Sequence, residues 1–205
     1  MKRTPQTRRE LILGSAALAL AACGKKEEAG KPGPAQYKVR LKTTKGEVVI
    51  LVHRDWSPLG ADHFYELVKM GFYNENAFFR CVPKFVVQWG MNGDPKVNKD
   101  WSQITIKDDP PKVSNKIGTV VFAKTSEPNS RTTQLFINLG DNSGTLDPQG
   151  FTPFGEVIVG MDTIIHLNME YGEQPSQEAI GEIGNAYLEE HFPRLDYVKK
   201  SEVLS

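Results

Sequence analysis

The amino-acid sequence predicts a mainly β domain in which short antiparallel strands form a closed or nearly closed sheet, with two or three helices beside it. Two observations favour this fold class. Several short runs alternate apolar and polar residues at strand spacing. Glycine occurs 18 times and proline 13 times, which suits a turn-rich β fold better than a helical bundle. The 205 residues, 39% of them hydrophobic and 24% charged, are enough for one packed domain and a tail.

The N-terminus has the pattern of an export signal. A basic segment precedes Leu11 to Ala22, an almost wholly apolar run that is too short to span a bilayer as a mature helix. The run ends in Leu20-Ala21-Ala22-Cys23, which resembles the lipobox of bacterial lipoproteins, whose cysteine is lipidated and becomes the new N-terminus. Thr7-Arg8-Arg9 upstream also resembles a twin-arginine export signal. An ordinary signal peptide followed by a chance cysteine is the alternative interpretation.

We therefore divide the chain into a signal peptide (1–22), a lipidated flexible tether (23–36) and one domain (37–205). Residues 24–36 are polar, contain glycine and proline and have no periodicity, which is typical of a linker. Acyl chains on Cys23 would anchor the protein to a membrane, with about 0.8 kcal/mol from each buried methylene. This predicts a lipid-anchored protein of the bacterial cell envelope, facing the periplasm or the outside of the cytoplasmic membrane.

The domain opens on a predicted hairpin and a helix. Apolar and polar residues alternate from Tyr37 to Lys42, a turn signal follows at 44–47, and Val48 to Val52 form a second apolar strand. Pro58 to Met70 is predicted to be helical, with Gly71 as its C-cap. The apolar residues that share one face of this helix are Ala61, Phe64, Leu67 and Val68.

The middle of the domain is predicted to consist mainly of strands. We expect one strand from Phe78 to Trp89, with alternate residues on its two sides. Phe85, Val87 and Trp89 are expected on one side, and Val86 and Gln88 on the other. Further strands are expected at 118–124, 134–139 and 153–159. The stretch from Asn92 to Pro111 is polar and loop-like, and a loop of that length in a compact domain is often functional.

Helices are predicted toward the C-terminus. A short one is expected from Gly160 to Asn168. A longer one is expected from Ser176 to His191, because apolar residues recur there at helical spacing, and Pro193 stops it.

Several kinds of chemistry are excluded by what the chain lacks. The histidines are His53, His63, His166 and His191, and none has a partner at metal-ligand spacing, so we expect no metal. There is no Gly-x-Ser-x-Gly, no phosphate-binding loop and no Gly-x-Gly-x-x-Gly, and we expect no cofactor. We interpret Cys81 as a buried structural thiol, with no disulfide, and Asp108-Asp109 as a solvated turn. A net charge of zero argues against a nucleic-acid binder.

Three co-linear segments carry a resemblance to one enzyme family. Asn76 to Gly90 (NAFFRCVPKFVVQWG) resembles a signature in which an arginine, a phenylalanine five residues on and a glutamine three further on line the active site. Thr133 to Ile137 (TQLFI) resembles the Ser-Gln-Phe-Phe-Ile strand of the same family. The third segment comprises Leu146-Asp147, GFTPFGEV at 150–157 and Gly160-Met161-Asp162. From about Tyr37 to Met169 the chain resembles the cyclophilins, which are peptidyl-prolyl cis-trans isomerases.

The resemblance implies a fold and an activity. It implies a closed antiparallel β-barrel of about eight strands capped by two helices, here with an extra C-terminal helix. It implies catalysed rotation about X–Pro bonds in exported or envelope proteins, which assists their folding. No bond is made or broken in that reaction, so no nucleophile, metal or cofactor is needed. The partners expected are proline-containing peptides and unfolded or exported proteins, and we expect a monomer. The alternative is a catalytically weak module that binds proline peptides as a chaperone or scaffold.

The resemblance also assigns the site. Arg80 and Gln88 are the catalytic pair, with Arg80 near the prolyl nitrogen and Gln88 bonded to the substrate backbone. The substrate-binding residues are Phe85, Val86, Gln134, Phe136, Leu146 and Phe151, with Gln134 also supporting Arg80. The chain departs from the family pattern at Phe79, Cys81, Val86, Trp89, Thr145 and Phe151. Phe151 stands where the family has a histidine, and Thr145 where it has a tryptophan.

Overall fold

The computed structural model describes residues 32–204 of the chain, and within them nine strands form one sheet in which every pairing is antiparallel. The strands are β1 (Gln36–Thr43), β2 (Gly46–His53), β3 (Asn76–Ala77), β4 (Arg80–Val82), β5 (Val86–Trp89), β6 (Thr119–Phe122), β7 (Leu135–Asn138), β8 (Pro153–Val159) and β9 (Tyr197–Leu204). The predicted mainly β antiparallel fold is confirmed. The predicted signal peptide, Cys23 and most of the tether lie outside the described residues.

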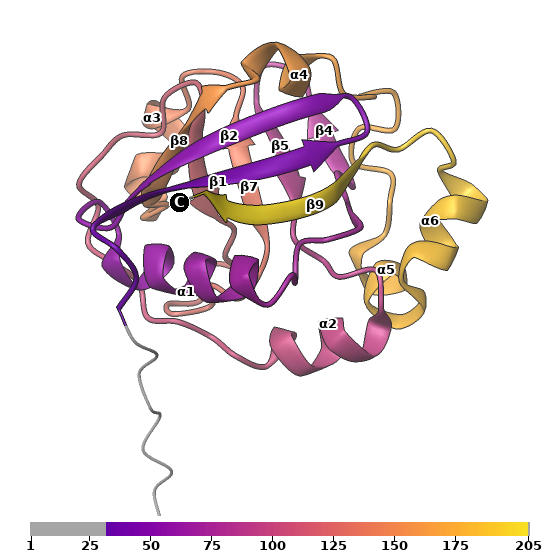
Figure 1. Cartoon of the computed structure of the whole chain (residues 1–205), viewed down its shortest axis with the longest axis horizontal. Helices are drawn as coiled ribbons and strands as arrows, with labels where there is room; N and C mark the ends of the chain where they lie inside the picture. The colour runs from indigo at the N-terminus through magenta and orange to yellow at the C-terminus, as the bar shows by residue number, and fades with distance from the viewer. Residues whose placement is uncertain (1–31, 205) are drawn as a thin grey trace, which may run out of the picture.

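The sheet curls round until its two ends approach each other. Its strand order is β3-β9-β1-β2-β8-β6-β7-β5-β4, and the end strands β3 and β4 are consecutive in the chain, separated only by Phe78 and Phe79. Figure 1 shows β1, β2 and β9 in front of β4, β5 and β7, as in a barrel.

Helices lie at the ends and at one side of the curled sheet. They are α1 (Pro58–Lys69), α2 (Pro95–Ser102), α3 (Ser143–Leu146), α4 (Met161–Ile165), α5 (Gln177–Ile183) and α6 (Asn185–His191), with a 3-10 turn at Asp147–Gln149. In Figure 1, α1 lies below the strands and α4 above them, while α5 and α6 lie to the right. Across residues 32–204, none of these helices has the length and apolar character needed to cross a membrane.

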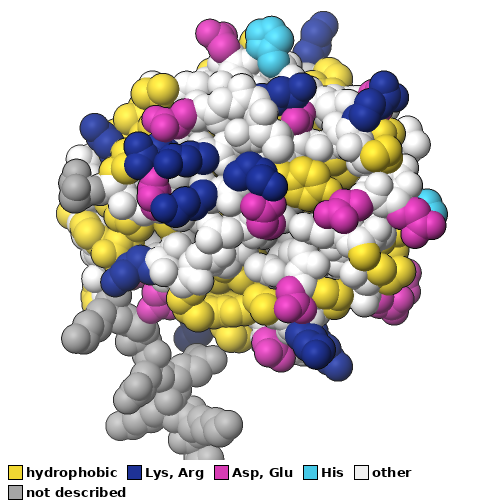
Figure 2. All heavy atoms as spheres, turned by 45° about the vertical axis from the view of Figure 1, so that its right-hand side comes forward, with side chains coloured by type: hydrophobic (Ala, Val, Ile, Leu, Met, Phe, Trp, Pro, Cys, Tyr) yellow, Lys and Arg dark blue, Asp and Glu magenta, His cyan; other side chains and the backbone are white. Residues whose placement is uncertain are grey.

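The main core fills the inside of the curled sheet. Alternate residues of β1 and β2 point into it, among them Val39, Leu41 and Ile50, which are fully buried. Lys38 and Arg40 of β1 point outward instead, and Arg40 Nε donates to Glu202 of β9 at 2.7 Å. Figure 2 shows a face on which Lys and Arg side chains gather with Asp and Glu side chains among them. On β1 the alternation therefore separates a core side from a charged side.

Helix α1 forms where the spacing predicts it and ends as predicted at Gly71. Gly71 has a positive φ of 73°, and the N–H of Phe72 donates to the Leu67 carbonyl at 2.9 Å while that of Gly71 donates to Val68 at 3.0 Å. This pattern satisfies carbonyls that would otherwise lack partners at the helix end.

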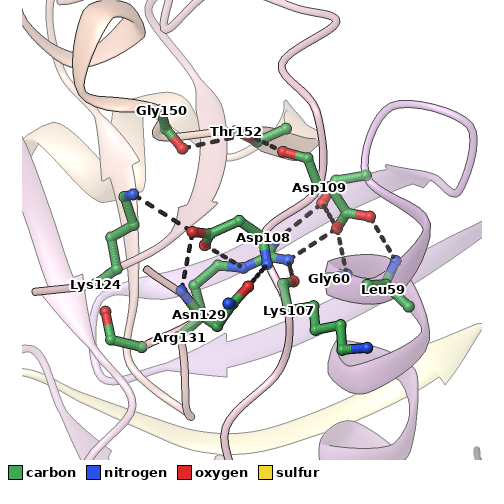
Figure 3. A network of polar contacts seen from close by, with 12 residues as sticks. Leu59, Gly60, Lys107, Asp108, Asp109, Lys124, Asn129, Arg131, Gly150 and Thr152 are labelled. Carbon is green, nitrogen blue, oxygen red and sulfur yellow. Dashed lines mark hydrogen bonds and ion pairs between the residues drawn. The ribbon is translucent and has the colours of Figure 1, made fainter. Parts of the chain in front are cut away.

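Asp109 is buried, and its interpretation as part of a solvated turn is wrong. Its carboxylate accepts hydrogen bonds from the N–H groups of Leu59 (3.1 Å) and Gly60 (3.0 Å) in the first turn of α1, and from the Ser57 hydroxyl at 2.5 Å (Figure 3). The Nη2 atom of the buried Arg131 lies 3.0 Å from the same carboxylate. A carboxylate at this place offsets both the N-terminal end of the helix dipole and the buried guanidinium.

The single strand expected from Phe78 to Trp89 is two strands, β4 and β5, joined by a turn. Residues 83–85 form that turn, in which Lys84 has a positive φ of 63° and the N–H of Phe85 donates to the Val82 carbonyl at 3.0 Å. Val87 and Trp89 point into the main core as predicted. Phe85 does not join them, because the turn directs its ring to the side of Val86.

Two further expectations need correction. The stretch from Asn92 to Pro111 is not all loop, since it contains α2, whose N-cap Asp94 accepts a hydrogen bond from Lys96 N at 2.8 Å. The helix expected from Ser176 to His191 is broken at Gly184 into α5 and α6. Gly184 has φ 74° and ψ −149°, a conformation that essentially only glycine adopts.

Cys81 is a buried thiol, as predicted. Its side chain is 2% exposed, and burial raises the pKa of the thiol to about 12. It is therefore protonated at neutral pH and serves as a small apolar residue.

Candidate active site

Strand register places four outward-facing side chains in one row across four strands. Arg80 of β4 lies opposite Gln88 of β5, Gln88 opposite Phe136 of β7, and Phe136 opposite Val121 of β6. Directly opposed residues on antiparallel strands project to the same face. The row is therefore a consequence of the pairing, and it runs from a cation through an amide to apolar side chains.

The guanidinium of Arg80 is held at the cationic end of the row. Its Nη1 donates to Gln88 Oε1 at 3.3 Å, and its Cζ lies 5.6 Å from the centroid of the Phe85 ring. The side chain is 24% exposed, so it is neither buried nor free in solvent. Contact with an aromatic face favours a cation in this position.

Gln88 is fixed from both ends of its amide. Its Oε1 accepts from Arg80, and its Nε2 donates to Gln134 Oε1 at 2.7 Å. Gln134 therefore supports Arg80 through Gln88, and no direct bond joins Gln134 to Arg80 among the described contacts. An amide nitrogen carries two protons, so Gln88 Nε2 keeps one for a ligand.

A second apolar cluster, separate from the main core, adjoins Arg80 and Gln88. Val86, Val121, Phe136 and Leu146 form its buried part, and Phe85, Ala123 and Phe151 pack against them. We call these residues the outer cluster. Phe136 and Phe151 meet edge to face, with ring centroids 5.7 Å apart. Val121 and Ala123 were not assigned to the site by the sequence, although they alternate with the inward-facing residues of β6.

Buried amides hold the loops that carry Leu146 and Phe151. Asn115 Nδ2 donates to the Phe151 carbonyl and to Asp147 Oδ1, both at 2.8 Å. Burial would raise the pKa of Asp147, but the hydrogen bonds from Asn115 bring the pKa below its usual range. Asn142 Nδ2 donates to the Phe85 carbonyl at 2.9 Å, which ties α3 to the turn after β4. The outer cluster is therefore fixed by polar contacts around its edge.

A second cation lies at the Phe151 end of the outer cluster. Lys124 Nζ is 5.8 Å from the centroid of the Phe151 ring and 3.8 Å from Asp108 Oδ2. Its side chain is 11% exposed. No sequence pattern predicts this contact, because it depends on where the segment that carries Asp108 folds back (Figure 3).

Glu173 is a polar neighbour of Arg80 that the sequence did not predict. Its Oε1 accepts from Arg80 Nε at 2.6 Å, and Arg80 Nη2 contacts the same oxygen. It belongs to the segment 170–174, which also lines a hollow of about 350 Å³ with Cys81, Val82 and Pro83. This hollow lies beside β4, and its lining does not include the outer cluster.

The structure brings together every site residue that the sequence predicted within the described range. The eight are Arg80, Gln88, Phe85, Val86, Gln134, Phe136, Leu146 and Phe151. Cys23, the predicted lipidation site, lies outside the described residues.

His63, by contrast, is part of the scaffold. Its Nε2 lies 2.8 Å from the Thr132 carbonyl, and its ring packs on Phe122 with centroids 5.7 Å apart. Burial lowers the pKa of His63 to about 4, and the nearby Arg131 lowers it as well. The ring is therefore neutral at pH 7.

Comparison with known proteins identifies the family. The family model "Cyclophilin type peptidyl-prolyl cis-trans isomerase/CLD" matches residues 38–183. A peptidyl-prolyl cis-trans isomerase of Acinetobacter baylyi is 34% identical over 134 residues, which cover 63% of this chain and 71% of that protein. Peptidyl-prolyl cis-trans isomerase B of Escherichia coli is 33% identical over 133 residues, covering 62% of this chain and 80% of the relative.

Solved structures show the same fold. A cyclophilin-type isomerase of Cryptosporidium parvum, crystallised in the presence of the dipeptide Ala-Pro, superposes with a TM-score of 0.61 at 18% identity. The match covers 82% of this chain and 99% of that one. The cyclophilin AquaCyp293 from Hirschia baltica superposes with a TM-score of 0.58 at 16% identity, covering 84% of this chain and 75% of its own. With a family model that matches most of its length, this chain belongs to the cyclophilin-type peptidyl-prolyl cis-trans isomerase family.

Proposed function

We propose that this chain catalyses rotation about X–Pro peptide bonds at the row formed by Arg80, Gln88 and Phe136. One observation carries the proposal: a guanidinium is held at the edge of an apolar cluster on the outer face of the sheet. Membership of the family supports the reaction class. The residues supply the two things that the reaction requires, which are a dry surface for the proline ring and a fixed donor beside it.

The donor acts on the electronic change during rotation. Amide resonance makes the X–Pro bond planar, and twisting it returns the lone pair to the prolyl nitrogen. A fixed hydrogen-bond donor near that nitrogen stabilises the twisted state more than the planar one. Arg80 suits this role because its guanidinium is permanently charged and carries several donors.

The amount by which the rotation barrier must fall is larger than one donor such as Arg80 supplies. The uncatalysed barrier is about 20 kcal/mol, and a turnover on the order of 10³ s⁻¹ corresponds to a barrier of roughly 13–14 kcal/mol. One preorganised donor contributes roughly 3–4 kcal/mol of the difference. The remainder has to come from holding one side of the bond while the other turns.

The outer cluster is proposed to hold the proline ring. Val86, Phe136 and Leu146 offer it apolar contacts, and Phe85 and Phe151 flank them. Gln88 uses its second amide proton to bond a backbone carbonyl of the substrate. Ring and backbone are then fixed on opposite sides of the bond that rotates.

The test is a protease-coupled assay on a short peptide containing Ala-Pro, in which only the trans form is cleaved. The wild type should accelerate isomerisation, and Arg80→Ala should lower kcat/KM by about 10²–10³-fold. Equal rates for the two proteins would show that the proposal is wrong. A wild-type protein that binds the peptide without accelerating its isomerisation would instead favour the alternative, a catalytically weak module that binds proline peptides.

We also propose that the enzyme works in the bacterial cell envelope on exported proteins, held by acyl chains on Cys23. The support is the sequence alone: a basic segment, an apolar run and Leu-Ala-Ala-Cys, followed by a polar linker. Labelling with radioactive palmitate in the native host should mark the wild type and not Cys23→Ala. An unlabelled wild type would contradict the anchor without affecting the enzymatic proposal.

A further inference from the structure

We infer that Glu173 is a positioning residue for Arg80, and that the segment 170–174 with α5 and α6 exists in part to hold it there. The inference rests on the proposed function, because it concerns how Arg80 is prepared for the reaction. It adds a role for segment 170–174, which lies C-terminal to the motifs that carry the resemblance.

The guanidinium of Arg80 is held by partners on two of its edges. Nη1 donates to Gln88 Oε1 at 3.3 Å, while Nε donates to Glu173 Oε1 at 2.6 Å and Nη2 contacts the same oxygen. All three nitrogen atoms therefore have a fixed neighbour. The guanidinium is planar, so partners on two of its edges fix both its place and the orientation of its plane.

Glu173 approaches Arg80 from the side away from the proposed proline site. One edge of β4 pairs with β5, where Arg80 lies opposite Gln88. At the other edge the N–H of Cys81 donates to the Gly172 carbonyl at 3.0 Å. Glu173 follows Gly172 directly and so reaches Arg80 from this second edge. It steadies the guanidinium without covering the outer cluster, which makes it a support and not a competitor of the substrate.

Segment 170–174 is itself held in place by contacts with the C-terminal helices. The ring of Tyr171 meets that of Phe192 edge to face, with centroids 5.1 Å apart, and both pack on a cluster that includes Ile180 and Leu188 of α5 and α6. Glu170 accepts from Arg194 Nη2 at 2.7 Å. Segment 170–174 is thus held by contacts with α5, α6 and the turn after α6, and Figure 1 shows these two helices at the right of the sheet.

The physical effect belongs to catalysis and not to folding. The Glu173 side chain is 61% exposed, and ion pairs this exposed contribute little to stability. A long arginine side chain without this partner would sample several rotamers and present its donors to the prolyl nitrogen only part of the time. Preorganisation of a transition-state donor should therefore be lost while the fold stays intact.

The experiment compares Glu173→Gln with Glu182→Gln, which makes the same charge change on an exposed residue of α5. Glu173→Gln should lower kcat for the proline peptide about tenfold, with KM within twofold and Tm unchanged. Glu182→Gln should match the wild type in all three. Glu173→Lys, which places a like charge beside Arg80, should lower kcat further than Glu173→Gln.

A double-mutant cycle tests whether the effect passes through the guanidinium. In an Arg80→Lys background, Glu173→Gln should change kcat by less than twofold, because an ammonium group cannot be held at two edges of a plane. The ¹⁵N spectrum gives a readout independent of activity: the Arg80 Nε–H signal should be sharp in the wild type and broadened or lost in Glu173→Gln.

The outcomes separate this inference from the proposed function. An inactive wild type would overturn the proposed function and this inference with it. An active wild type whose Glu173→Gln variant keeps its kcat, or gains activity, would overturn only the inference. An effect of Glu173→Gln that persists in the Arg80→Lys background, or an Arg80 signal that the substitution leaves unchanged, would also overturn it.

Discussion

The same strands supply two apolar clusters that differ in what surrounds them. From β5, β6 and β7, the side chains of Val87, Phe122 and Ile137 point into the main core, where Phe122 also contacts the ring of the buried His63. From the same strands, Val86, Val121 and Phe136 point outward into the outer cluster. A strand with one solvated face should carry polar residues outward. On these strands both faces carry apolar residues, and Arg80 and Gln88 lie beside the outer ones, an arrangement that suits the proposed proline-binding role.

The comparison implies a division of labour. The main core is enclosed by the sheet, so its packing should determine the free energy of unfolding. The outer cluster is bordered by partly exposed residues, so it should determine binding and catalysis more than stability. The following variants test that division from the largest expected effect to the smallest.

The largest effect is expected from truncating a matched pair of rings, Phe122→Ala and Phe136→Ala. Phe122 is 1% exposed inside the sheet, and its truncation should lower the free energy of unfolding by about 3–5 kcal/mol. Phe136→Ala should cost less stability, about 1–3 kcal/mol, because the partly buried Phe85, Ala123 and Phe151 border it in place of a closed core. It should lower kcat/KM strongly, whereas any Phe122→Ala protein that remains folded should keep its kcat/KM. Urea unfolding measures the stability and the isomerase assay measures kcat/KM. A larger stability loss in Phe136→Ala, or a larger activity loss in a folded Phe122→Ala, would contradict the comparison.

A pH titration probes the inner side through His63. The pKa of this histidine is lowered from 6.5 to about 4 in the folded state because burial disfavours its charge. Between these values only the unfolded chain takes up the proton, so stability present above pH 6.5 is lost as the pH falls toward 4. The loss should be on the order of 3 kcal/mol.

The control for that titration is a second histidine. His63→Gln, whose amide can still donate to the Thr132 carbonyl, should flatten the pH dependence of the free energy of unfolding. The same change at the exposed His166 should leave the slope as it is. A wild-type stability that does not vary between pH 6.5 and 4 would contradict the neutral buried state of His63.

The smallest effect on catalysis is expected at Gln134, which is linked to Arg80 by hydrogen bonds through Gln88. Gln134→Ala removes the acceptor for Gln88 Nε2 and leaves that amide free to turn, so kcat/KM should fall by about three- to tenfold. Gln103→Ala, at the exposed end of α2, is the matched control and should have no effect. An unchanged Gln134→Ala enzyme would mean that Gln88 needs no support on this side.

The resemblance to the cyclophilins supplied the site residues, because their motifs can be matched along the sequence. Arg80, Phe85 and Gln88 come from one motif and Phe136 from another, and the structure shows that strand pairing brings the two motifs together. The turn within 78–89 was missed because the apolar residues on both sides of Pro83-Lys84 resemble one strand, although proline favours turns and Lys84 has a positive φ. The break at Gly184 was missed in the same way, since helical periodicity continues across it.

Long-range contacts were beyond prediction for a different reason. Glu173 meets Arg80 across 93 residues of sequence, and Asp109 meets the start of α1 across about 50. Each contact depends on how an irregular segment docks, and neither periodicity nor composition encodes that. These were also the places where charged residues were assigned to solvent or left without a role.

The account rests on the outer cluster as the place where a proline ring binds beside Arg80, and methyl NMR tests this most directly. A short Ala-Pro peptide is titrated into the wild type with labelled valine and leucine methyl groups. The account predicts shifts at Val86, Val121 and Leu146, contacts between these methyl groups and the proline ring protons, and no change at Val87 or Val120. Shifts confined to residues around the hollow beside β4, with the outer cluster unchanged, would contradict it.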